Sequence, residues 1–423
     1  MQFTKIALAA VATVAFVGSA QAGTRYLTGA SATSLNATKA LVSLCSDAAG
    51  TATVYKQDTT ATALGNFFTV KCSKDFAGLA GTNAVAFNVD GGSFTAVEAS
   101  TGGVGVKFSP TTGGTATAGS GNLAGIALQT GVTATGTTLS EGGFMDIEPA
   151  AFGSTLIDGF GGVDGLAPNL AAASFNQVFG VAVSKKLYQD MQAAQGINAT
   201  TCATGADERA PACQPTISRA QYATIVSSDF NAPKTDGAAF LGSAAGKLTV
   251  CRRVDTSGTQ ASSNQYFLNN LTGFTPSVNG STTPASASAY PLNSTDTPNF
   301  GVSESATTSL ARTCLASTTA ANIGVLSLEN TPAVADNYRF VKISRVEAFD
   351  VTGTNRSKAT AKAGEYDFVF NSMKYTAAGA GSSDVIEAID AKLGDLTTNN
   401  GLFGNTESTY NRNGNNANVI TKK

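Results

Sequence analysis

The residues best suited to chemistry lie together in segment 253–259, which has the sequence Arg-Val-Asp-Thr-Ser-Gly-Thr. Arg253 carries a planar guanidinium that can hold an oxyanion through two parallel N–H bonds. Ser257, Gly258 and Thr259 offer backbone amides and hydroxyls as further donors. Together these groups predict a site for a small oxyanion. The same residues also suit an ordinary turn that caps a helix, so the segment alone does not decide between the two.

A strand and a helix on either side are needed to position this segment. Residues 247–251 (Lys-Leu-Thr-Val-Cys) are apolar and β-branched, which is typical of a short buried strand. Residues 261–269 contain no Gly or Pro and predict a helix, which Ser257 or Thr259 would cap. The free N–H groups of a first helical turn, and the helix dipole, both favour a bound anion.

A second unit of the same kind is predicted near the start of the chain. Residues 24–28 predict a strand, 29–34 a turn of small residues, and 35–45 a helix capped by Thr33 or Ser34. Open α/β sheets bind ligands where strands pass into helices in this way. Thr33 and Ser34 are therefore candidate binding residues from a second part of the chain.

Two further candidates follow short predicted strands. Asp146 stands at the end of the apolar segment 143–145 and would bring a carboxylate to the site. Ser93 ends the sequence Asp-Gly-Gly-Ser, which follows a strand predicted at 84–89. That sequence is also typical of a plain hairpin turn, so both readings of Ser93 stay open.

Composition excludes several classes of function. The chain contains no histidine, which removes Ser-His-Asp and Cys-His catalysis and the usual zinc and iron sites. We therefore expect no enzymatic activity, no metal and no cofactor. The formal net charge of −2 gives no indication of a nucleic-acid partner.

The N-terminus predicts export. Residues 1–22 combine an early lysine, an apolar run and an Ala-Gln-Ala ending, which are the features of a signal peptide cleaved after Ala22. No later segment approaches about 18 uninterrupted apolar residues, so we expect no membrane insertion. The mature protein is expected in the periplasm or outside the cell.

Six cysteines in an exported chain favour three disulfides over metal ligation. Order along the chain suggests the pairs Cys45–Cys72, Cys202–Cys213 and Cys251–Cys314. The middle pair has the firmest basis, because it closes a small loop that contains proline and has little else to hold it. The other two pairs rest on order alone.

Three stretches resemble the phosphate-binding protein of bacterial ABC phosphate importers, a type II periplasmic binding protein. Residues 28–33 (Thr-Gly-Ala-Ser-Ala-Thr) resemble the family motif Thr-Gly-Ala-Gly-Ala-Thr-Phe, and 253–259 resemble Arg-x-Asp-Gly-Ser-Gly-Thr. Residues 143–149 (Gly-Phe-Met-Asp-Ile-Glu-Pro) resemble a Gly-x-Ser-Asp segment that supplies an aspartate. The chain departs from these motifs at Ser34, Thr256 and Met145, where the family has Phe, Gly and Ser.

The resemblance implies an α/β fold with the two lobes of a type II periplasmic binding protein, here with Gly/Thr-rich β insertions. One lobe would contain residues 23–178 and 344–423, the other 179–343, with phosphate in the cleft between them. In that arrangement Asp146 accepts a proton from the ligand, and Ser93 replaces the family's other binding serine. The implied partner is an ABC permease.

An alternative function has the same fold but no role in transport. At 13% charged residues the surface depends on Ser, Thr, Asn and Gly, and the chain carries long insertions around 95–140 and 276–300. These features also suit an extracellular structural or surface protein. The sequence leaves both functions open.

Overall fold

The computed structural model describes residues 23–152, 154–197, 202, 207–226, 238–243, 246–268, 300–348, 358–378, 383–395, 401–412 and 420–423. The predicted signal peptide and its cleavage after Ala22 lie outside these residues. None of the helices in the described ranges has the length and apolar character needed to cross a membrane.

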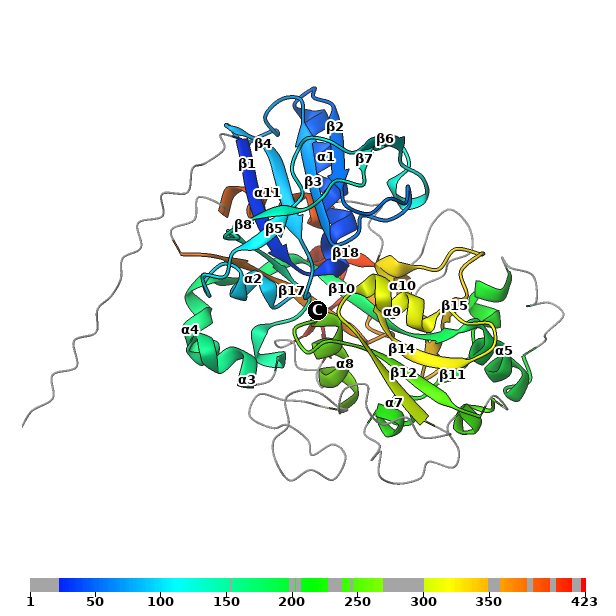
Figure 1. The fold of residues 1–423 in the computed structure, drawn as a ribbon. Coiled ribbons are helices and arrows are strands. Elements are labelled where there is room, and N and C mark those ends of the chain that lie inside the picture. The colour runs from blue at the N-terminus through cyan, green and yellow to red at the C-terminus, as the bar shows by residue number, and fades with distance from the viewer. Residues whose placement is uncertain are drawn as a thin grey trace, which may run out of the picture.

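The fold is mixed α/β and has two lobes, as the sequence predicts (Figure 1). Both lobes share one sheet, in the order β13-β12-β14-β10-β17-β9-β1-β4-β3-β2-β7-β6, with β15 and β18 also paired to β10. The strands of the first lobe are β1 (Gly23–Gly29), β2 (Ala52–Lys56), β3 (Phe67–Cys72), β4 (Thr82–Asn88), β6 (Thr115–Ala118), β7 (Ala127–Thr130), β9 (Gly142–Met145), β17 (Val369–Thr376) and β18 (Leu402–Gly404). Those of the second are β12 (Leu248–Arg253), β13 (Phe300–Ser305), β14 (Ala321–Ser327) and β15 (Tyr338–Phe340).

Strand β10 (Leu170–Ser184) connects the lobes. Its first part pairs with β17 and its second part, from Phe179 to Val183, pairs with β14. One long strand therefore belongs to both lobes. The predicted lobe boundaries, 178/179 and 343/344, stay a prediction.

Parallel pairing places the carboxyl ends of several strands at the same edge of the sheet. In the first lobe β1 runs parallel to β4 and to β9, and in the second β12 runs parallel to β13 and to β14. The carboxyl ends within each group consequently lie at one edge of the sheet. This is the edge at which open α/β sheets bind ligands.

Helices cover the sheet around two hydrophobic cores. Leu41 of α1 and Ile389 of α11 pack in the smaller core with Val85 of β4, and Leu187 of α5 belongs to the larger core with Ile323 of β14. Ser184 caps α5 by accepting a hydrogen bond from the Leu187 N–H at 3.3 Å, as its sequence position suggests. The helices are α1 (Ser34–Asp47), α2 (Thr95–Glu98), α3 (Ser154–Ile157), α4 (Gly162–Leu166), α5 (Lys185–Ala194), α7 (Arg219–Val226), α8 (Gly258–Leu268), α9 (Thr308–Leu315), α10 (Ala359–Ala363) and α11 (Ser383–Asp395).

The Gly/Thr-rich insertion at 95–140 forms β structure, as the resemblance implies, in two antiparallel strand pairs after the single turn of α2. Its strands β6 and β7 extend the main sheet, whereas β5 (Val106–Phe108) and β8 (Thr135–Thr138) make a separate pair. Two more small pairs complete the strands: β11 (Thr216–Ile217) with β16 (Lys342–Ile343), and β19 (Tyr410–Arg412) with β20 (Ile420–Lys422).

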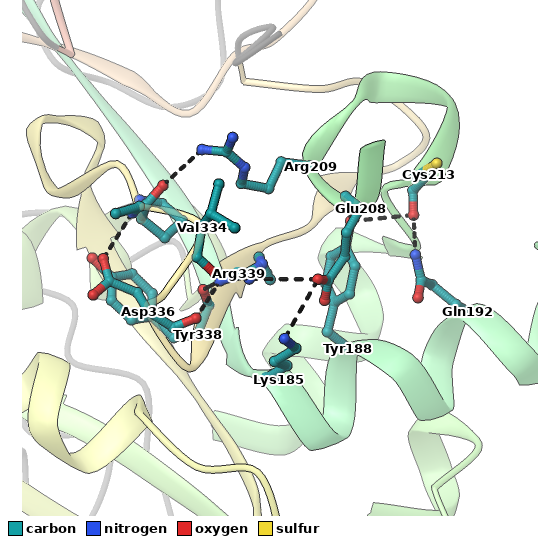
Figure 2. A network of polar contacts seen from close by, with 12 residues as sticks. Lys185, Tyr188, Gln192, Glu208, Arg209, Cys213, Val334, Asp336, Tyr338 and Arg339 are labelled. Atoms are coloured by element: carbon teal, nitrogen blue, oxygen red, sulfur yellow. Dashed lines mark hydrogen bonds and ion pairs between the residues drawn. The ribbon is translucent and has the colours of Figure 1, made fainter. Parts of the chain in front are cut away.

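The three disulfides predicted from chain order, Cys45–Cys72, Cys202–Cys213 and Cys251–Cys314, are the pairs found. The middle disulfide closes a loop that brings Glu208 into a buried polar network (Figure 2). Glu208 lies 3.4 Å from the Arg339 guanidinium and 3.7 Å from the Lys185 ammonium, and the Tyr188 hydroxyl donates to its carbonyl. The network ties the disulfide loop to α5 and β15.

Candidate functional site

The site forms where the two groups of parallel strand ends face each other. Ser31, Ser93 and Asp146 follow β1, β4 and β9, while Arg253 ends β12 and Thr308 follows β13. Hydrogen bonds and close packing join these residues across the lobes. In Figure 1 the region lies between the two lobes, beside α8 and α9.

Asp146 and Ser93 form a buried pair in the first lobe. The Ser93 hydroxyl donates to Asp146 Oδ2 at 3.0 Å, and the Asp146 backbone N–H donates to Ser93 Oγ at 3.3 Å. Asp146 is 1% exposed, and its other carboxyl oxygen, Oδ1, is buried without a hydrogen-bond partner. A buried polar atom without a partner is costly, so an O–H donated to Oδ1 would be stabilising.

The start of α8 packs directly against this pair. A Cβ added to Gly258 would lie 2.3 Å from Ser93 Oγ and 2.7 Å from Asp146 Oδ2, so only glycine fits there. On the facing turn, a Cβ at Gly92 would lie 2.7 Å from the Ser257 Cα. The Phe94 N–H also donates to the Thr256 carbonyl at 3.0 Å. Main chain from both lobes therefore meets at the site, and the free amides of the first turn of α8 are close to Asp146.

Arg253 is buried and held in a fixed orientation. Its Nε and Nη2 donate to the carbonyls of Ser305 and Ala306 at 3.2 and 3.0 Å, and its Nη1 donates to Thr308 Oγ1 at 2.6 Å. Each terminal nitrogen has a second N–H beyond these bonds, so the guanidinium keeps donors for a ligand. The neighbouring Arg252 pairs with Asp255 instead. Arg253 is thus not the partner of a surface aspartate.

Ser31, in the turn after β1, contacts the opposite lobe. Its hydroxyl lies 2.8 Å from Thr308 Oγ1, the same atom that accepts from Arg253. The hydroxyls of Thr33 and Ser34 donate within their own turn, to the carbonyls of Ala30 and Ser31 at 3.0 and 2.8 Å. These hydroxyl oxygens can still accept a hydrogen bond from a ligand, whereas the hydroxyl protons are already donated within the turn.

Asp146 in the first lobe and Arg253 in the second influence each other's pKa. Burial raises the pKa of Asp146 to about 7, against the opposing effects of the Ser93 hydrogen bond and the Arg253 charge. Burial likewise lowers the pKa of Arg253 to about 10, while Asp146 and Asp90 oppose the fall. Arg253 stays cationic near neutral pH, whereas Asp146 titrates there.

Of the eight predicted binding residues, the structure brings Ser93, Asp146, Arg253, Ser257 and Gly258 together most directly. Thr33 and Ser34 lie one turn away, next to Ser31, and Thr259 is buried in the first turn of α8. Sequence reasoning missed Ser31 and Thr308. Ser31 stands inside the recognised turn and was detectable there, whereas Thr308 has no motif and is placed by strand pairing.

Within the described residues, no group of three or more cysteine, aspartate or glutamate side chains is arranged to hold a metal ion. The chemistry of the site is that of hydrogen-bond donors, one guanidinium and carboxyl groups. Such a set suits an oxyanion that carries an O–H.

No protein-family model and no curated protein sequence matches the chain. Among solved structures it is similar to a protein of Clostridium perfringens, described as a phosphate ABC transporter substrate-binding protein with bound phosphate. The identity is 11% and the TM-score 0.43, over 88% of this chain and 94% of the other. It is also similar to PstS from Borrelia burgdorferi, at 11% identity and a TM-score of 0.36 over 90% and 98% of the two chains. Likeness at this level assigns no ligand or partner to the chain.

Proposed function

We propose that the protein is an exported solute-binding protein that captures a small oxyanion, phosphate, between its lobes for uptake by an ABC permease. The observation that carries this proposal is the unpartnered, buried Oδ1 of Asp146 close to the charge of Arg253. A phosphate between them would accept hydrogen bonds from the guanidinium and from the amides of α8. It would donate its own O–H to Asp146.

The carboxyl group makes phosphate a better ligand than sulfate. A carboxylate beside a bound anion is repulsive unless the ligand carries a proton that the carboxylate can accept. Phosphate and arsenate carry such a proton near neutral pH, and sulfate does not. Sulfate would place a lone pair against Asp146, which disfavours its binding.

Lobe closure completes the proposed mechanism. Residues 23–178 with 344–423 would supply Ser31, Ser93 and Asp146, and residues 179–343 would supply Arg253 and α8. The ligand would bridge the two groups and stabilise the closed arrangement, in which β10 links the lobes. No catalytic step is needed.

The test is titration calorimetry of the mature chain, residues 23–423, with phosphate. We expect Arg253→Ala to lower affinity by roughly 10²- to 10⁴-fold, because it removes charge-assisted bonds worth about 1.5–3 kcal/mol each. Arg252→Ala is the matched control. Because successive side chains of a strand point to opposite faces of the sheet, Arg252 points away from the face of Arg253. Arg252 pairs with Asp255 and Glu304, so its removal should leave phosphate affinity unchanged.

Binding that survives Arg253→Ala unchanged would refute the assignment of Arg253. A mature chain that binds no phosphate at all would refute the function. Circular dichroism of each variant establishes that folding is retained.

One observation favours the surface-protein alternative. β6 is the last strand of the sheet, and three of its four residues are exposed. Within the described residues its outer edge has no paired strand. Such an edge can pair with another chain. Concentration-dependent assembly in sedimentation, without phosphate binding, would support this alternative.

A further inference from the structure

Glu329 reaches the same edge of the sheet as Arg253. It lies in the 3-10 turn Leu328–Asn330, which directly follows β14, and β14 runs parallel to β12. Their carboxyl ends therefore point the same way. The turn packs against Ser31–Thr33 of the first lobe, so Glu329 lies beside the junction of the two lobes.

The Glu329 side chain is enclosed and incompletely satisfied. The residue is 8% exposed, and its Oε2 is buried without a hydrogen-bond partner. The charged groups that act on it are Asp146 after β9, Arg312 on α9 and Lys39 on α1. Strand β10, the turn Ser31–Thr33 and the segment 401–404 also pack near it, and they contain no charged residue.

Two buried carboxyl groups, Glu329 and Asp146, are thus near enough to repel each other, and the charge of Arg253 acts on Asp146. Burial, with repulsion from Asp146, raises the pKa of Glu329 well above its ordinary value, although Arg312 and Lys39 oppose the rise. A neutral carboxyl group has an O–H to donate as well as oxygen atoms that accept. An anion entering the site would disfavour ionisation of Glu329 further.

We propose that Glu329 is a second ligand-binding carboxyl group, which donates its own O–H to one ligand oxygen while Asp146 accepts an O–H from another. This inference rests on the proposed oxyanion function. It narrows the ligand to a protonated tetrahedral oxyanion, held between one carboxyl donor and one carboxyl acceptor. It also makes binding dependent on pH, since an ionised Glu329 cannot donate and repels the anion.

A structural role for Glu329 is the competing explanation. In that case the carboxylate is ionised and is stabilised by Arg312 and Lys39, without any part in binding. The two explanations differ in how affinity changes with pH. They also differ in whether an amide can replace the carboxyl group.

The experiment measures phosphate dissociation constants from about pH 6 to about pH 9 for wild type and Glu329→Gln. The glutamine amide donates at every pH, so the ligand's own titration cancels in the ratio of the two constants. We expect affinities within about threefold of each other at low pH. Above the raised pKa of Glu329, the variant should bind more tightly, by up to about tenfold per pH unit. Glu387→Gln on the exposed face of α11, where Glu387 pairs with Lys374, is the control.

If Glu329→Gln fails to fold, a second measurement on the wild-type protein tests the same proposal. Calorimetry of wild type in buffers of different ionisation enthalpy should show proton uptake on phosphate binding above the pKa of Glu329. A ratio that is constant over pH, or binding without proton uptake in that range, would overturn the role of Glu329 while leaving the oxyanion function intact. Wild type that binds no phosphate at any pH would overturn both.

Discussion

Asp146→Asn tests the electrostatics of the site without any ligand. Asp146 is almost fully buried, one carboxyl oxygen accepts from Ser93 at 3.0 Å, and the other has no hydrogen-bond partner. Asparagine has nearly the same shape and no charge. The substitution therefore removes the cost of ionising a carboxyl group in this position while keeping the packing against Gly258.

The magnitude follows from the raised pKa. Asp146 titrates at about 7 in the folded protein, whereas an unfolded aspartate titrates near 4. Because the folded-state pKa is raised, the protonated group favours folding at low pH, and this stabilisation is lost as pH rises towards 7. The full difference of about three pKa units corresponds to about 4 kcal/mol of unfolding free energy.

The assay is urea denaturation of both proteins, without phosphate, from about pH 4 to about pH 8. The unfolding free energy of Asp146→Asn minus that of wild type should rise by about 1.4 kcal/mol per pH unit up to about pH 7 and then level off. Asp158→Asn, at an exposed position, controls for the exchange of a carboxylate for an amide. A flat difference would refute the raised pKa.

The remaining predictions concern selectivity and stability. Asp146→Asn should narrow the gap between phosphate and sulfate affinities in calorimetry, because an amide can donate to either anion; unchanged discrimination would place Asp146 outside the site. Glu208→Gln should lower the unfolding free energy by about 3–5 kcal/mol, because it leaves Arg339 buried without its 3.4 Å carboxylate partner. Urea denaturation measures this loss, and a change below about 1 kcal/mol would show that the backbone carbonyls around Arg339 suffice.

Local sequence patterns predicted the elements that carry the site. The strand–turn–helix units at β1–α1 and β12–α8 appear within a few residues of their expected bounds. Residues 365–370 (Glu-Tyr-Asp-Phe-Val-Phe) alternate charged or β-branched with aromatic residues, a pattern typical of a strand, yet β17 begins only at Val369. The Tyr366 hydroxyl instead donates to the Phe179 carbonyl at 2.7 Å, and Phe368 stacks on Tyr266 with ring centroids 4.4 Å apart. The alternating aromatic residues there reflect core packing rather than sheet pairing.

The candidate site was predictable only where a motif exists. Segment 253–259 identified Arg253 because an arginine before a small-residue turn has a recognisable chemistry. Thr308, which holds the guanidinium, is 55 positions away in sequence, and Glu329 follows a strand with no distinctive residue at its end. Only the parallel register of β12 with β13 and β14 brings these residues together. Register depends on tertiary packing, which one sequence does not reveal.

The glycine at the start of α8 sets how near the two lobes can come. The first turn of α8 rests on Ser93 and Asp146 with no room for a methyl group at Gly258. On the facing turn, Gly92 lies against the Ser257 backbone, so part of this contact is between main-chain atoms, which cannot rotate away as a side chain can. A larger residue at Gly258 would act as a steric spacer and hold the lobes apart. In the proposed binding cycle, the size of the enclosed space, and therefore of the largest ligand that it can surround, depends on the absence of side chains at Gly92 and Gly258.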